Sequence, residues 1–161
     1  MNLFPWFLFA HILGAIIAFG PTFSSPLISQ MGRGEPMHVN FATRLGRRLV
    51  RVQVLPLAFV QGATGVGLIW AGNVDVFKAS WLLLAIALYL ITLAFAIFVQ
   101  TPVVSRIVAM TTPPPGAAQA GPPAGGPPPE LMALGQRAKR GGLFLMVMVV
   151  SIVFLMVVKP F

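Results

Sequence analysis

The chain alternates between four long apolar stretches and shorter polar connections. The stretches cover about residues 3–28, 49–71, 79–104 and 141–158. A hydrocarbon core about 30 Å thick needs roughly 20 helical residues to cross it. The first three stretches reach that length, and Arg140 and Lys159 bracket the shorter fourth. The pattern predicts an all-α, four-helix transmembrane bundle that forms one membrane domain over residues 1–161.

The composition agrees with a membrane chain and excludes several other classes. Hydrophobic residues make up 57% of the chain and charged residues only 9%, against about 25% charged in soluble domains. A chain this poor in charge cannot cover its surface in water, which argues against a soluble enzyme. The absence of cysteine excludes disulfides, zinc–thiolate sites and iron–sulfur clusters.

The formal net charge of +8 follows from where the basic residues lie. Nine of the eleven lie on or beside the first and third connections: Arg33, Arg44, Arg47, Arg48, Arg51, Arg106, Arg137, Lys139 and Arg140. Only Lys78 and Lys159 lie on the other side. Because cytoplasmic loops carry an excess of Lys and Arg, both long loops should be cytoplasmic and both termini extracytoplasmic. The bias indicates the inner (cytoplasmic) membrane. It also explains the positive net charge, so no nucleic-acid partner is needed to account for that charge.

The three connections differ in character. In the first, arginines at 44, 47, 48 and 51 share one helical face, which suits either contact with anionic headgroups or docking of a partner protein. The second, residues 72–78, is short and predicts that the flanking helices are antiparallel neighbours. The third holds eight prolines in residues 111–129, which predicts a Pro/Gly-rich linker. A short helix over residues 130–140 should then lead into the last span.

Polar side chains inside the spans should lie at one depth in the outer half of the membrane. His11 lies eight residues into the first stretch, about 12 Å deep at 1.5 Å per residue. The other members of this polar layer are Gln61, Thr64, Tyr89 and Ser151, and Met148 lies at the same depth. Such a layer either joins the helices by hydrogen bonds or forms a cofactor or substrate site. A neutral His11 would donate one hydrogen bond, and we expect Gln61 or Tyr89 to accept it.

Small residues mark where helices should approach closely. Ala10, Gly14 and Ala18 recur every four residues, and residues 61–67 contain three glycines. This spacing is common in membrane helix packing, although glycines beside His11 could also make room for a flat macrocycle. Pro21 and Pro56 should kink the first two helices.

The chain carries no familiar catalytic motif, and its only acids are Glu35, Asp75 and Glu130, all in predicted loops. A proton pump or cation exchanger normally needs a carboxylate within the membrane. The protein is therefore most simply non-catalytic. If it binds haem, the axial ligand is His11 alone, His11 with Met148, or two copies of His11 across a homodimer.

At this point several segments resemble a known family. Residues 9–17 (FAHILGAII) are similar to the "LHILGAI" opening of an uncharacterised integral membrane family, domain of unknown function 2269. Residues 48–56 and 65–69 resemble its second helix, and residues 102–107 its P-x-x-x-R-I element. Residues 153–160 (VFLMVVKP) resemble its terminus. Each segment is mostly apolar, but their order and spacing make the resemblance specific over nearly the whole chain.

The same plan more distantly resembles HemJ-type protoporphyrinogen oxidases and copper-resistance D proteins. The first resemblance implies haem b at His11. Helix spacing and depth place Gly14, Gln61, Tyr89 and Met148 around that position. Those oxidases also carry a W-L-H-V-K element, where this chain has WLLLA at residues 81–85. The histidine and lysine are absent, so the resemblance does not extend to that element.

Three hypotheses follow from the sequence. The leading one is a small, non-catalytic protein of the lipid bilayer that serves as a structural or accessory subunit of a larger membrane complex. The alternative is a haem b-binding redox protein with His11 as axial ligand. A weaker alternative is copper handling through Met146, Met148 and Met156.

Overall fold

The computed structural model describes residues 2–34, 38–112 and 127–160. These residues form an all-helical bundle and include no strand. The helices are α1 (Phe4–Gly34), α2 (Val39–Leu49), α3 (Leu55–Ala71), α4 (Ser80–Phe95), α5 (Thr101–Thr111) and α6 (Pro129–Val158). Two π-helical turns, η2 (Val50–Val54) and η3 (Ala96–Gln100), join α2 to α3 and α4 to α5.

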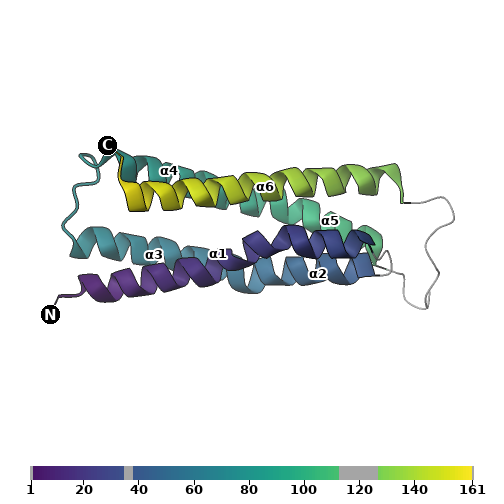
Figure 1. The fold of residues 1–161 in the computed structure, drawn as a ribbon, viewed down its shortest axis with the longest axis horizontal. Helices are drawn as coiled ribbons and strands as arrows, with labels where there is room; N and C mark the ends of the chain where they lie inside the picture. The colour runs from purple at the N-terminus through teal and green to yellow at the C-terminus, as the bar shows by residue number, and fades with distance from the viewer. Residues whose placement is uncertain (1, 35–37, 113–126, 161) are drawn as a thin grey trace.

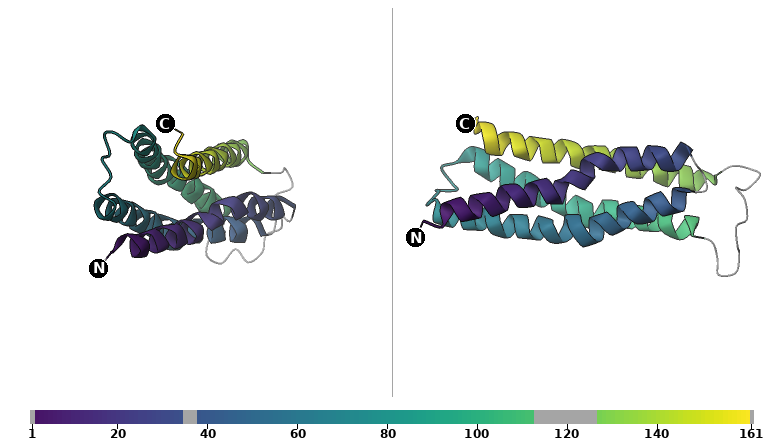
Figure 2. Two further views of the ribbon diagram at one scale, coloured as in Figure 1. Left: turned by 60° about the vertical axis from the view of Figure 1, so that its left-hand side comes forward. Right: turned by 60° about the horizontal axis from the view of Figure 1, so that its bottom comes forward.

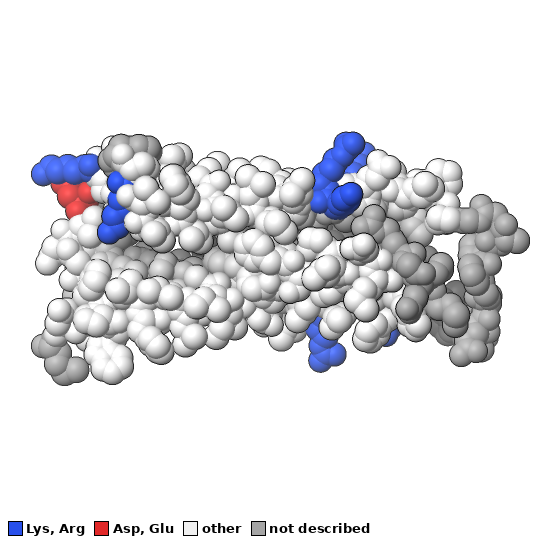
Figure 3. All heavy atoms as spheres, viewed as in Figure 1, with Lys and Arg blue, Asp and Glu red and all other residues white. Residues whose placement is uncertain are grey.

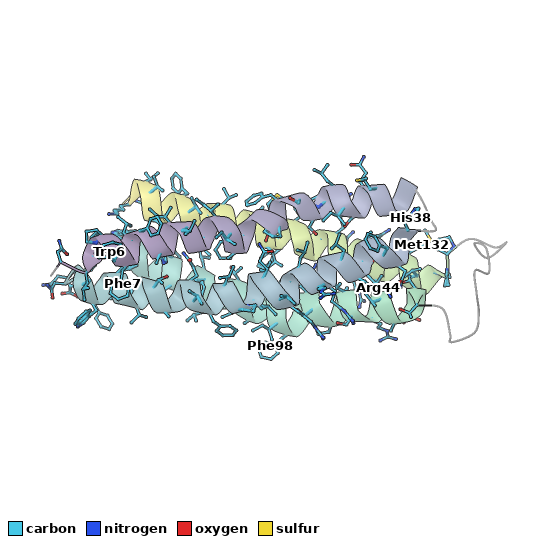
Figure 4. All side chains as sticks on the ribbon, turned by 90° about the horizontal axis from the view of Figure 1, so that it is seen from below. Trp6, Phe7, His38, Arg44, Phe98 and Met132 are labelled. Atoms are coloured by element: carbon cyan, nitrogen blue, oxygen red, sulfur yellow. The ribbon has the colours of Figure 1, made fainter. Side chains whose placement is uncertain are left out.

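Four continuous helical rods result, and each is long and apolar enough to cross a membrane. They cover Phe4–Met31, Val39–Ala71, Ser80–Thr111 and Pro129–Val158. This finding confirms the all-α class and the four candidate spans predicted from the sequence. Many large apolar side chains on the rods are exposed, and Phe98, at 76% exposed, is one of them. Figure 4 shows it projecting away from the ribbon. Such a surface suits contact with lipid.

The helices continue beyond the predicted spans at the end that carries most of the basic residues. α1 ends at Gly34 and α2 begins at Val39, whereas the apolar stretches end near 28 and begin near 49. Likewise α5 ends at Thr111, and α6 begins at Pro129 without a break before residue 141. The apolar pattern predicts only the part of each helix that suits contact with lipid. Arginine and lysine are good helix formers, so the helix can continue beyond that part. Most of the predicted linker lies outside the described residues.

The four rods form two pairs in one half of the molecule. α1 packs most extensively against α3, and α4 against α6, whereas α2 and α5 pack together in the other half. The two termini and the 72–79 connection lie at the same end of the bundle (Figure 1). Figure 2 shows the two pairs from the end and the bend near the middle of α1.

The prediction that the helices flanking residues 72–78 are antiparallel neighbours is only partly correct, because the two rods pack together through α2 and α5, and α3 and α4 meet mainly through Tyr89. The backbones of α3 and α4 run antiparallel but stay apart, and the connection crosses from one helix pair to the other (Figure 1). The physical reason is the glycine-rich face of α3, which packs against α1 and leaves α4 to pair with α6.

Both π-helical turns lie just before a proline. η2 ends two residues before Pro56, and η3 ends two residues before Pro102. Within each turn the backbone bond shifts by one residue, so that Leu55 N–H reaches the Val50 carbonyl and Thr101 N–H reaches that of Ala96. Proline has no N–H to donate to the carbonyl four residues before it, and local π adjustments accompany prolines in membrane helices. The two rods thereby stay continuous across their prolines.

Charged residues occupy two levels along the bundle. Figure 3 shows Lys and Arg near the end with the termini and again in the other half, with an uncharged surface between them. The second level, here called the basic belt, comprises Arg44, Arg47, Arg48, Arg51, Arg106, Arg137, Lys139 and Arg140. Within the belt Arg106 forms an ion pair with Glu130 at 2.6 Å. The uncharged surface is the part of the molecule that fits a bilayer.

Candidate functional site: polar contacts between the helices

His11 on α1 is joined to Thr64 on α3. Its Nδ1 lies 2.9 Å from Thr64 Oγ1, which itself lies 3.0 Å from the Val60 carbonyl and 3.1 Å from that of Gln61. A threonine hydroxyl has one hydrogen, and here it is directed to its own helix backbone. This arrangement favours the tautomer in which Thr64 Oγ1 accepts from His11 Nδ1–H and Nε2 carries no proton. The expected acceptors, Gln61 and Tyr89, do not fill this role.

Tyr89 connects the two helix pairs. Its hydroxyl donates a hydrogen bond of 2.8 Å from α4 to the Ala58 carbonyl on α3. The hydroxyl lies directly over Gly62, where a Cβ atom would approach it to 2.8 Å. Gly62 therefore leaves an opening through which the tyrosine reaches the α3 backbone, and a larger residue there would block that bond.

Gln61 is the one buried polar residue among those described, with 6% of its surface exposed. Its Oε1 has no hydrogen-bond partner within the described structure. This oxygen lies against Gly14 of α1, 2.8 Å from where a Cβ atom would be. The Gln61 side chain thus fills the space that Gly14 leaves open, and only the backbone carbonyl of Gln61 lies near the His11 ring.

The space beside Gly65 and Gly67 of α3 is filled in the same way by side chains from α1. A Cβ atom on Gly65 would lie 3.4 Å from His11 Cε1, and one on Gly67 would lie 2.5 Å from the Phe7 ring. The predicted close approach of α1 and α3 is therefore correct. The chain's own side chains occupy the space that these glycines leave.

Ser151 and Met148 lie apart from these contacts on α6. Ser151 donates to the Val147 carbonyl of its own helix at 2.9 Å, and Met148 is half-buried. The layer predicted from depth alone thus resolves into a His11–Thr64 pair, a Tyr89–Ala58 bond and a buried Gln61. Among residues 2–34, 38–112 and 127–160, no group of three His, Asp or Glu side chains is placed to hold a metal ion.

Two glutamines that the sequence reading did not single out make further bonds between helices. Gln53 Nε2 donates to the Ile17 carbonyl of α1 at 2.8 Å, and Gln100 Nε2 donates to the Ala138 carbonyl of α6 at 3.0 Å. Ile17 lies four residues before Pro21, so its carbonyl has lost its usual helical donor. Gln53 supplies that donor from the neighbouring helix. Proline spacing marks the carbonyl in the sequence, but only packing identifies the glutamine.

The basic end of the bundle is joined by polar bonds as well. Asn40 on α2 donates to Thr111 Oγ1 at 3.0 Å and to Thr112 Oγ1 at 3.1 Å. In Figure 4, Arg44, His38 and Met132 lie at this end, and Trp6 and Phe7 lie at the opposite one. The two ends of the rods are thus chemically different, which is the usual condition for a protein with a fixed orientation in the membrane.

Four apolar helical rods held together by polar and glycine contacts define an integral membrane protein with four candidate spans. A family model described as predicted integral membrane protein (DUF2269) matches residues 6–160. The chain belongs to this family. No match to the chain was found among curated proteins or among solved structures.

Proposed function

We propose that this protein is a non-catalytic, multi-pass protein of the inner membrane that serves as a structural or accessory subunit. The observation that carries the proposal is the use of its polar side chains. Gln53, Tyr89 and Gln100 each donate to a backbone carbonyl of another helix, and His11 bonds to Thr64. Interhelical hydrogen bonds of this kind stabilise membrane bundles. A bundle whose polar groups serve its own packing acts through its outer surface, which contacts lipid and neighbouring membrane chains.

The proposed orientation places both termini outside and the basic belt at the cytoplasmic surface. A reporter fused after Phe161 should be extracytoplasmic, and one inserted near Gly121 should be cytoplasmic, because of the excess of basic residues on the first and third connections. Protease or cysteine-labelling accessibility in intact spheroplasts would measure both sites. The reverse result at both sites would contradict the orientation.

The packing role of His11 gives a second expected result. Protein purified from a haem-sufficient host should be colourless, and His11→Ala should lower the free energy of unfolding by about 0.6–1.7 kcal/mol, as loss of a membrane hydrogen bond does. Thr64→Val should cost about the same, and the double variant little more, because both remove one bond. Unfolding in mixed micelles and an absorption spectrum measure these quantities.

The same purification tests the alternative of a haem b protein. His11 Nε2 is the nitrogen left for an axial ligand once Nδ1 bonds to Thr64. A Soret band in the wild type that disappears in His11→Ala and persists in Thr64→Val would establish His11 as a haem ligand. That outcome would overturn the non-catalytic proposal.

A further inference from the structure

The stripe of residues that runs from α2 into η2 lines a surface groove. Leu45, Arg48, Leu49, Val52 and Gln53 surround a space of about 260 Å³. Their spacing of three, four, seven and eight residues places them on one face of the continuous helix. The lining residues therefore follow one another along the helix axis, an arrangement that suits an extended chain better than a compact solute.

The wall of the groove is almost entirely apolar, and one cation lies beside it. Leu45, Leu49 and Val52 supply the apolar surface, with Leu45 39% and Val52 70% exposed. The cation is Arg48, which is exposed and has no carboxylate partner among the described residues. Gln53 already donates its amide hydrogen to Ile17. An occupant that matches this wall has an apolar chain and an anionic group.

The groove also lies at the level where such molecules are found. Arg48 belongs to the basic belt, and Val52 lies one turn further toward the uncharged surface shown in Figure 3. Arg44 and Arg51 lie one turn before Arg48 and nearly one turn after it, and both are exposed. Anionic lipids gather at clusters of arginine and lysine at the membrane surface. Along the helix, the cation Arg48 therefore comes first and the apolar Val52 second, in the same order as the headgroup and the acyl chain of a lipid in the adjacent leaflet.

We propose that this groove binds one anionic phospholipid from the leaflet beside the basic belt. The phosphate lies at the Arg48 guanidinium, and the start of one acyl chain lies along Leu49 and Val52. Guanidinium groups bind phosphate through two parallel hydrogen bonds, whereas the acyl chain gains from contact with the apolar wall. The site is separate from the His11–Thr64 pair and does not depend on the proposed subunit role.

Native mass spectrometry of the detergent-purified protein tests the proposal. Phosphatidylglycerol and phosphatidylcholine with identical acyl chains are added at equal concentration, and the fraction of protein that retains one lipid is compared. We expect retention of phosphatidylglycerol to be about five-fold higher than that of phosphatidylcholine, and Arg48→Gln to remove this preference, consistent with the loss of one surface charge contact. Val52→Trp should fill the groove and reduce retention of both lipids.

Lys139→Gln is the matched control because it removes one charge from the same belt on α6, which does not pack against α2. Retention in Lys139→Gln should stay within about two-fold of the wild type. Equal losses in Lys139→Gln and Arg48→Gln would show general attraction by the belt and overturn the site, as would equal retention of the two lipids. Displacement of the lipid by millimolar glycerol phosphate would show a headgroup-only anion site and would also overturn the proposal.

Discussion

Replacing Gly141 by leucine should lower the free energy of unfolding by about 3 kcal/mol, whereas the same change at the adjacent Gly142 should be nearly neutral. Both glycines lie within α6. A Cβ atom on Gly141 would collide with the Gln100 side chain and approach the Phe95 ring, but one on Gly142 would meet nothing within 4 Å. Comparison of the two variants separates the effect of close packing on stability from that of helix propensity, because both substitutions change the intrinsic helix propensity by the same amount.

The large cost at Gly141 has two sources. A leucine there must push Gln100 aside, and Gln100 would lose its bond to the Ala138 carbonyl. It would also crowd the contact between Phe95 and Phe144, whose ring centroids are 4.6 Å apart. Overpacking costs about 1–3 kcal/mol, and loss of the interhelical bond adds about 0.6 kcal/mol.

Unfolding of the two variants in SDS-containing mixed micelles would measure this difference. Gly141→Ala should lower the free energy of unfolding less than Gly141→Leu does, because the far end of Gln100 can move to accommodate a single methyl group. Equal stability of Gly141→Leu and Gly142→Leu would show that α4 and α6 do not approach at Gly141.

The sequence predicts the four spans because a helix that crosses lipid must be apolar over most of its length. Each apolar stretch can therefore be recognised directly from its composition. It also places His11 and Thr64 at one depth, since depth follows from counting residues along each helix. It does not predict their bond, because depth leaves open the angle at which each side chain points. The chosen acceptors, Gln61 and Tyr89, share that depth but are directed toward Gly14 and the Ala58 carbonyl.

The partner of α4 could not be read from the sequence for a related reason. A connection as short as residues 72–79 restricts the distance between two helix ends but not the faces that pack. Gly65 and Gly67 determine the outcome, since they admit His11 and Phe7 of α1, whereas Gly62 admits the Tyr89 hydroxyl from α4. The close contact at Gly141 could not be predicted either, because the side chain that packs against it, Gln100, lies 41 positions away in the sequence.

Removing the Gln53 side-chain amide should destabilise the protein only while Pro21 is present. Pro21 cannot donate to the Ile17 carbonyl, and Gln53 Nε2 provides the replacement bond at 2.8 Å. Gln53→Leu should therefore lower the free energy of unfolding by about 1.5 kcal/mol, because a carbonyl within the apolar region is left without a donor.

In a Pro21→Ala background, Gln53→Leu should cost less than about 0.5 kcal/mol, because the backbone N–H of residue 21 then bonds to the Ile17 carbonyl. The coupling of about 1 kcal/mol between residues 21 and 53 is the quantity to measure, by unfolding the four proteins of this cycle. Gln100→Leu is the matched control, since it removes a glutamine bond to Ala138, a carbonyl unrelated to Pro21. Its cost should be the same in both backgrounds. A Gln53→Leu cost that does not depend on residue 21 would show that Gln53 stabilises the bundle by packing and not by serving the carbonyl that proline leaves open.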